Sequence, residues 1–118
     1  ESGELHINSS LTLDPPKPKS YAFCSDTAYS EQICEFIKGV DLLYHEATFL
    51  EIDRHLADKT LHSTATDAAR IAALAQVQDL LLGHFSVRYK NRNAMLEEAL
   101  PFFNSVRLAA DGLTLRYF

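Results

Sequence analysis

The chain has 118 residues, a mass of 13.2 kDa and 47% hydrophobic residues, which fits one domain with its own core. Its formal net charge of -5 excludes a general attraction to polyanions, so contact with nucleic acid would need a local basic patch or bound metal ions. Two cysteines are too few for a disulfide framework, and no apolar run reaches the roughly 20 residues that span a bilayer. We therefore expect a cytoplasmic protein without a membrane segment.

The first part of the chain predicts a connection and not a core element. Residues 1–20 show little periodicity and contain the run LTLDPPKPKS, whose three prolines stiffen the backbone. We expect this connecting segment to lead into a domain over residues 21–118.

The next residues alternate between strand and helix patterns. Residues 21–24 (YAFC) predict a short strand. Residues 29–39 (YSEQICEFIKG) predict a helix, with Ser30 as its N-cap and Gly39 as its C-terminal end. Residues 40–45 (VDLLYH) predict a second strand.

The alternation continues with a stronger helix. Residues 63–76 (STATDAARIAALAQ) predict a helix capped by Ser63 or Thr64, with Asp67 in the first turn, where the helix dipole favours negative charge. A third strand is expected at residues 77–83 and a further helix at residues 93–103.

The C-terminal run, VRLAADGLTLRYF, contains two β-like segments joined near Asp111 and Gly112, which predicts a hairpin. Strands that alternate with helices at this spacing predict an α/β fold with a largely parallel sheet and right-handed crossovers. In such a sheet the carboxyl ends of the parallel strands share one edge, so the residues after each strand should converge there.

Polar side chains follow each predicted strand. Asp26 comes after the first strand, Glu46 after the second and His84 after the third. Zinc accepts imidazole nitrogen and carboxylate oxygen, and a carboxylate can bridge two metal ions. Asp26 and His84 are therefore candidate metal ligands.

A second group of residues suits the chemistry of a phosphodiester. His62 precedes a helix whose first N–H groups are unpaired, and it could donate a proton to a leaving oxygen. Glu46 within hydrogen-bond reach would fix the tautomer of that ring and favour its protonated form. Arg88 could bind a phosphate through two hydrogen bonds, with Lys90 and Arg92 as outer contacts.

Each of these residues also has a purely structural interpretation. Asp26 could cap a turn, and His84 could be a satisfied histidine at the end of a strand. Glu46 could pair with any nearby cation, His62 could be an ordinary residue before a helix cap, and the basic cluster around Arg88 could be a solvated loop.

The remaining histidines have weaker claims to a site. His45 is expected to pack beneath it and not to bind metal, and His6 and His55 are expected to be solvated. Two ligands are too few for a catalytic zinc site, and the chain contains no His-x-His-x-Asp-His cluster that could supply the others.

Five motifs in order, SDT, LLYHEATF, LHSTATDAARIA, LLLGHFSVRY and LAADGLTL, together resemble the C-terminal part of ribonuclease Z. That family comprises tRNA 3′-processing endonucleases of the metallo-β-lactamase superfamily. The resemblance extends over about residues 11–117 and implies the C-terminal half of an αββα sandwich, a mixed sheet covered by helices, with the N-terminal half absent. One local departure is Ser25, at a position where the family more commonly has glycine.

The resemblance also implies an activity and a role for each site residue. The family is zinc-dependent, uses two ions per site, and removes the 3′ trailer of precursor tRNA as a homodimer. Asp26 would bridge the two ions and His84 would bind one of them. His62 would act on the leaving group, Glu46 would orient His62, and Arg88 would lie near the scissile phosphate.

The family's His-x-His-x-Asp-His motif lies upstream of the region matched here. The chain by itself is therefore expected to bind zinc weakly and to hydrolyse little or nothing. Two other functions remain open from the sequence: a different metallo-β-lactamase-fold hydrolase or phosphodiesterase, and a non-catalytic α/β interaction domain.

Overall fold

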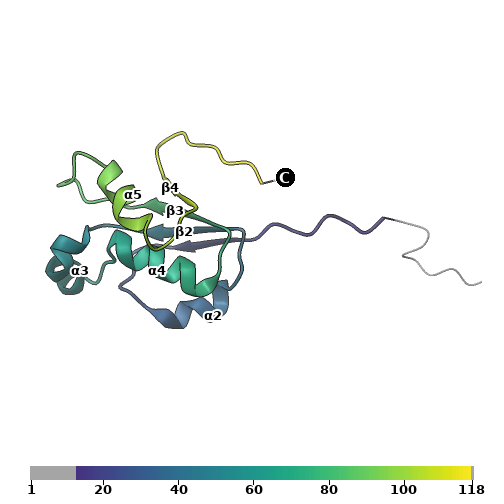
Figure 1. Cartoon of the computed structure of the whole chain (residues 1–118), viewed down its shortest axis with the longest axis horizontal. Helices are drawn as coiled ribbons and strands as arrows, with labels where there is room; N and C mark the ends of the chain where they lie inside the picture. Colours follow the sequence, from purple (N-terminus) through teal and green to yellow (C-terminus); the bar gives the residue numbers. More distant parts are fainter. Residues whose placement is uncertain (1–12, 118) are drawn as a thin grey trace, which may run out of the picture.

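The core of the protein is a four-stranded parallel sheet, seen in a computed structural model that describes residues 13–117 (Figure 1). The strands lie in chain order and are β1 (Tyr21–Cys24), β2 (Leu42–Glu46), β3 (Asp79–Gly83) and β4 (Val106–Leu108). Each right-handed crossover therefore moves one strand further in the same direction, which places the helices on one face of the sheet.

Helices fill the connections between the strands. Between β1 and β2 the chain forms a 3₁₀ turn, η1 (Glu31–Ile33), and a short helix, α2 (Cys34–Ile37). Between β2 and β3 lie η2 (Glu51–Asp53), α3 (Arg54–Thr60) and α4 (Ala65–Ala75). The last connection contains α5 (Asn93–Ala99), and Figure 1 shows α4 between α2 and α5.

The main core lies between α4 and the sheet. Leu43, Leu80 and Leu82 are fully buried on the strand side. The buried face of α4 consists mostly of alanines, at positions 65, 68, 69, 72 and 75, together with Ile71. Because alanine side chains are small, the helix backbone can approach the leucines closely, and packing of this kind is dense and sensitive to changes in volume.

The opposite face of the sheet carries an apolar row. Phe23 on β1 stacks on Tyr44 of β2 with ring centroids 4.6 Å apart, and Leu81 of β3 follows in register. Tyr21 and Phe23 are 58% and 63% exposed within the described chain. Parallel sheets are normally covered on both faces, so this face has the composition of a packing surface.

Most of the predicted elements are confirmed, but the hairpin is wrong. A turn does form near Gly112, where the Leu113 N–H donates to the Ala110 carbonyl. Residues 113–117 then form no strand; instead the Tyr117 hydroxyl donates to Asp79 at the start of β3. The sheet is consequently parallel throughout the described residues and not mixed, because the run that would have paired antiparallel does not join it.

Two further details differ from the sequence prediction. The helix expected over residues 29–39 is limited to η1 and α2, and the Ser30 side chain makes no cap hydrogen bond. Helix α3 was not anticipated from residues 46–61. No helix in residues 13–117 is long and apolar enough to cross a membrane.

Candidate active site

Four predicted site residues meet at the carboxyl edge of the sheet. Asp26 follows β1, Glu46 is the last residue of β2, and His84 follows β3 directly. His62 lies in the turn between α3 and α4. One ligand atom from each of the four lies within 4.8 Å of those of the other three. The expected convergence of these residues is therefore present in the fold.

The backbone turns sharply where these residues are presented. Asp26 and His84 have φ angles of 51° and 58°, and Leu61, just before His62, has a φ of 59°. The left-handed region is uncommon for residues other than glycine and carries a small energetic cost. These three positions lie in the connections that follow β1, β3 and α3, next to or within the residues that form the cluster.

Glu46 is the buried centre of the cluster. Its Oε1 accepts hydrogen bonds from the Thr27 N–H at 2.7 Å and from His62 Nδ1 at 2.7 Å. Its Oε2 accepts from the Ser63 N–H at 3.1 Å and from the Thr48 hydroxyl. Burial alone would raise the pKa of this carboxyl, but the four hydrogen bonds outweigh it and hold the pKa below its usual value. Glu46 is thus an ionised anchor with little capacity left to bind a metal ion.

Asp26 and His84 have the geometry of two ligands of one cation. Asp26 Oδ1 lies 3.2 Å from His84 Nε2, and the two side chains are 72% and 43% exposed. Zinc holds such ligands at about 2.0–2.1 Å, which puts two ligands of a tetrahedral ion roughly 3.3 Å apart. The donor types and their spacing therefore fit zinc, and their exposure leaves room for further ligands.

His62 is held by one ring nitrogen and leaves the other for chemistry. Nδ1 is the nitrogen bound to Glu46, and the ring stacks on that of His84 with centroids 5.3 Å apart. The ring of Phe49 packs edge-on against His62 at 6.3 Å. This arrangement fixes the ring plane and leaves Nε2 as the position that can exchange a proton.

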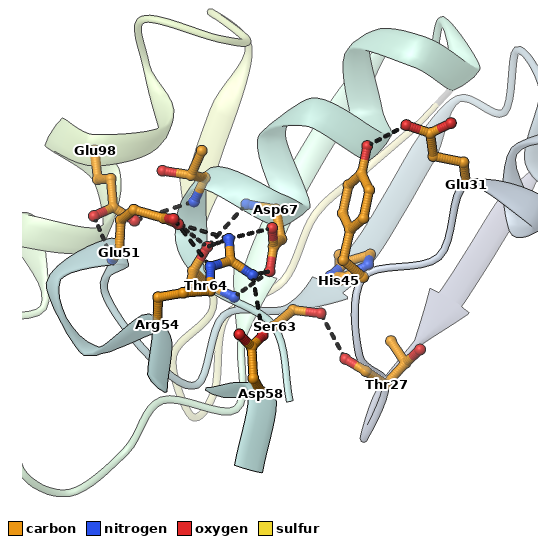
Figure 2. Close-up of polar contacts among 12 residues, drawn as sticks. Thr27, Glu31, His45, Glu51, Arg54, Asp58, Ser63, Thr64, Asp67 and Glu98 are labelled. Carbon is orange, nitrogen blue, oxygen red and sulfur yellow. Dashed lines mark hydrogen bonds and ion pairs between the residues drawn. The ribbon is translucent and has the colours of Figure 1, made fainter. Parts of the chain in front are cut away.

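The turn that carries His62 is fastened by a polar network at the start of α4 (Figure 2). Thr64 and Asp67 form a reciprocal capping box. The Arg54 guanidinium donates to both oxygens of Asp67, at 2.6 and 2.9 Å, and also pairs with Glu51. The Ser63 hydroxyl reaches the Thr27 carbonyl at 2.5 Å, which ties this turn to the loop that carries Asp26.

Arg88 lies outside the four-residue cluster. Its guanidinium is 3.6 Å from Asp53 and sits over the ring of Phe49 at 5.8 Å, the same ring that packs against His62. Tyr89 anchors the same loop, because its hydroxyl accepts from the Leu50 N–H at 3.0 Å and donates to Asp53. The phosphate-binding role of Arg88 stays a prediction.

Several known proteins with similar sequences are named ribonuclease Z. A ribonuclease Z from Parabacteroides distasonis is 48% identical over 113 residues, which is 96% of this chain and 37% of the relative. A ribonuclease Z from Porphyromonas gingivalis is 50% identical over the same shares of both chains. The chain is similar in sequence to one part of these ribonuclease Z proteins. It spans 37% of the length of these relatives, and no protein-family model matches it.

Solved structures give the fold of this chain. The metallo-β-lactamase fold protein YhfI from Bacillus subtilis superposes with a TM-score of 0.72 at 26% identity, covering 77% of this chain and 37% of that one. The short form of human tRNase Z gives a TM-score of 0.56 at 31% identity, covering 76% and 29%. The predicted relation to the metallo-β-lactamase fold is confirmed.

Two further histidines of residues 13–117 are not members of the four-residue cluster. His45 is fully buried, its Nδ1–H donates to the Glu46 carbonyl at 2.8 Å, and burial lowers its pKa. Its Nε2 has no hydrogen-bond partner within residues 13–117. His55 is exposed on α3, and His6 lies outside the described residues.

Sequence reasoning overlooked two residues that shape the site. Thr48 is only 7% exposed and contacts Glu46 and His84. Arg54 forms an ion pair with Asp67, close to the turn that contains His62. A threonine two residues beyond a strand carries no distinctive signal. Arg54 falls in a segment whose helix was not predicted, so its alignment with the start of α4 could not be inferred.

Proposed function

We propose that this chain is the C-terminal catalytic portion of a zinc-dependent endoribonuclease that removes the 3′ trailer of precursor tRNA. The observation that carries the proposal is the convergence of Asp26, Glu46, His62 and His84 in a chain homologous to ribonuclease Z. In this proposal residues 1–20 are a connecting segment and residues 21–118 are half of a metallo-β-lactamase-type domain. We call the longer protein that completes it the intact protein.

The open face of the sheet supports this division. Phe23, Tyr44 and Leu81 form an apolar row on a face that no helix of residues 13–117 covers. A second sheet from the rest of the intact protein would bury the row and give the sandwich its second layer. The same part would supply the metal ligands that this chain lacks.

Asp26 and His84 are the residues that would hold zinc. Bound zinc ions would supply Lewis acidity that activates water and neutralises charge on the phosphoryl oxygens. Asp26 offers a carboxylate able to bridge two ions, and His84 offers one imidazole nitrogen. Glu46 would remain a hydrogen-bond acceptor behind them, because its oxygens are already engaged.

His62 would protonate the leaving oxygen. Cleavage that leaves a 3′-hydroxyl on the tRNA requires a proton for the departing 3′ oxygen, and Nε2 of His62 is the available donor. Glu46 accepts from Nδ1 and keeps the ring in its orientation. Arg88 would exchange its long contact with Asp53 for a phosphate oxygen of the substrate.

The experiment is cleavage of a precursor tRNA by the intact protein, with the cut site mapped. We expect cleavage on the 3′ side of the tRNA body, and losses of at least about 100-fold in turnover for His62→Ala and Asp26→Ala. His55→Ala, at an exposed position on α3, is the matched control. Wild-type turnover in both site variants would overturn the residue assignments.

A second candidate function is hydrolysis of another substrate on the same metal frame. The favouring observation is the TM-score of 0.72 with YhfI, against 0.56 with human tRNase Z. Assaying the intact protein on precursor tRNA beside small phosphodiesters and other esters separates the two. Faster turnover of a small ester than of precursor tRNA would favour this second function.

Two wider properties belong to the same proposal. The likeness to ribonuclease Z supports a homodimer for the intact protein and a cytoplasmic location, where precursor tRNA is available. Light scattering of the intact protein tests the first, and fractionation of the source cells tests the second.

A further inference from the structure

The Thr48 hydroxyl connects the buried Glu46 to His84, one of the proposed metal ligands. It lies two residues after β2, and its hydroxyl contacts the Oε2 atom of Glu46 and, at 2.9 Å, the Nδ1 atom of His84. His62 Nδ1 is further away, at 3.4 Å, and is engaged instead by Glu46 at 2.7 Å. The hydroxyl therefore joins two groups, one acidic and one basic.

Counting protons fixes the direction of these hydrogen bonds. An ionised carboxylate can only accept, so the single proton of the Thr48 hydroxyl must point to Glu46. The hydroxyl oxygen can then only accept from His84, which requires the proton of a neutral His84 ring to sit on Nδ1. The other ring nitrogen, Nε2, is left as a bare lone pair.

That lone pair faces another acceptor. Nε2 of His84 lies 3.2 Å from Oδ1 of Asp26, and neither atom carries a proton when Asp26 is ionised and His84 is neutral. Two lone pairs at this separation repel each other unless a cation lies between them. For a neutral His84 ring, the contact is thus favourable in the presence of a cation and unfavourable in its absence.

We propose that Thr48 is a positioning residue that holds His84 in the Nδ1–H tautomer, so that Nε2 is kept bare toward Asp26 for a metal ion. The proposal rests on the proposed zinc site. It adds to that site a hydrogen bond that decides which ring nitrogen of His84 is free to bind the metal ion. The buried carboxylate of Glu46 therefore orients both histidine rings. It acts on His84 through Thr48, and it binds Nδ1 of His62 directly.

The backbone around Thr48 allows its hydroxyl to be removed without moving the loop. The Thr48 carbonyl accepts from the Ser86 N–H at 3.0 Å, and the Ala47 N–H donates to the Gly83 carbonyl at 2.8 Å. These bonds hold the segments after β2 and β3 side by side and involve no side chain. Valine has the same shape as threonine, so Thr48→Val removes little beyond the hydrogen bonds.

The first test reads the tautomer directly in the metal-free intact protein. Nitrogen NMR of ¹⁵N-histidine-labelled protein, at a pH where the rings are neutral, is assigned by comparison with His84→Gln. We expect the Nδ1–H form of His84 in the wild type and a shift toward Nε2–H in Thr48→Val. A wild-type ring protonated on Nε2 would overturn the proposal whatever Thr48→Val shows.

The second test measures zinc affinity of the intact protein by competition with a chelating dye. Loss of a partner that orients a metal ligand typically weakens binding about 10–100-fold, and we expect this for Thr48→Val. Thr48→Ser, which keeps the hydroxyl, should bind zinc as tightly as the wild type does. Thr60→Val, on the surface of α3, is the matched control. Unchanged affinity in Thr48→Val would also overturn the proposal.

These tests separate this inference from the proposed function. The tautomer and zinc affinity can follow the expectation even if precursor tRNA is not cleaved, in which case only the substrate assignment fails. Cleavage of precursor tRNA with an Nε2–H ring in His84 would leave the function intact and remove the role of Thr48.

Discussion

Asp26 and His84 approach to 3.2 Å although the strands that precede them, β1 and β3, are separated by β2. Both side chains reach across the end of the middle strand, where Glu46 lies buried beneath them. Both residues have left-handed backbone angles, with φ of 51° and 58°, which residues other than glycine seldom adopt.

Asp26→Asn should abolish metal binding without loss of stability. The substitution keeps the shape of an exposed side chain but replaces an anionic ligand by an amide that can donate to His84. We expect a metal content near zero in the purified intact protein and a change in the free energy of unfolding within about 0.5 kcal/mol. Asp111→Asn, in the exposed C-terminal turn, is the control. Full metal content in Asp26→Asn would show that Asp26 is not a ligand.

Glu46→Gln should destabilise the protein and also disable the site. Glutamine fills the same volume but presents an NH₂ group to donors that now point at a carboxylate oxygen. Hydrogen bonds to charged groups contribute about 1.5–3 kcal/mol each, so we expect a loss of about 2–4 kcal/mol in the free energy of unfolding. Denaturant titration of the intact protein measures it, with the exposed Glu35→Gln on α2 as control. A loss below about 1 kcal/mol would contradict the central role of Glu46.

Gly83→Ala should disrupt the strand end that presents His84. A Cβ atom at this position would be built into the ring of Tyr44, which lies directly over the glycine on the open face of the sheet. Overpacking of this kind costs about 1–3 kcal/mol. Adding Tyr44→Ala should recover part of the loss, and a double-mutant cycle would measure the coupling. Additive effects of the two substitutions would exclude a direct clash.

Stability should fall in mild acid because of His45. Burial lowers the pKa of this ring below its ordinary value of 6.5, so the unfolded chain binds a proton that the folded protein does not. The stabilisation is complete above pH 6.5 and is lost as the pH falls below it, with a slope of at most about 1.4 kcal/mol per pH unit.

His45→Asn tests this dependence because the asparagine amide can still donate to the Glu46 carbonyl. We expect the free energy of unfolding of the variant to change less steeply between pH 6.5 and 5 than that of the wild type. His55→Asn removes an exposed histidine and serves as the control. Parallel pH profiles for the wild type and His45→Asn would contradict the assignment.

Much of the fold could be predicted because local pattern and tertiary packing agree. Alternation of apolar strands with a strongly capped helix predicted a parallel sheet, and Thr64 and Asp67 form the expected capping box. The same topology rule predicted that Asp26, Glu46 and His84 would meet at one edge, since that edge follows from strand direction alone.

The remaining features depend on contacts that the sequence does not encode locally. The Asp111–Gly112 turn forms, but whether the next residues pair with β4 is decided by distant partners, such as Asp79 for Tyr117. Thr48 gains its position only when β2 and β3 lie side by side. The Arg54–Asp67 pair likewise requires α3 to pack against the start of α4.

The most direct measurement is an anomalous difference map at the zinc absorption edge, from crystals of the intact protein grown with zinc. We expect a peak within about 2.0–2.2 Å of both the Asp26 carboxylate and Nε2 of His84. Glu46 should stay bound to His62 and Thr48 and lie outside bonding distance of the metal. Zinc peaks confined to other parts of the protein, with none between Asp26 and His84, would contradict it.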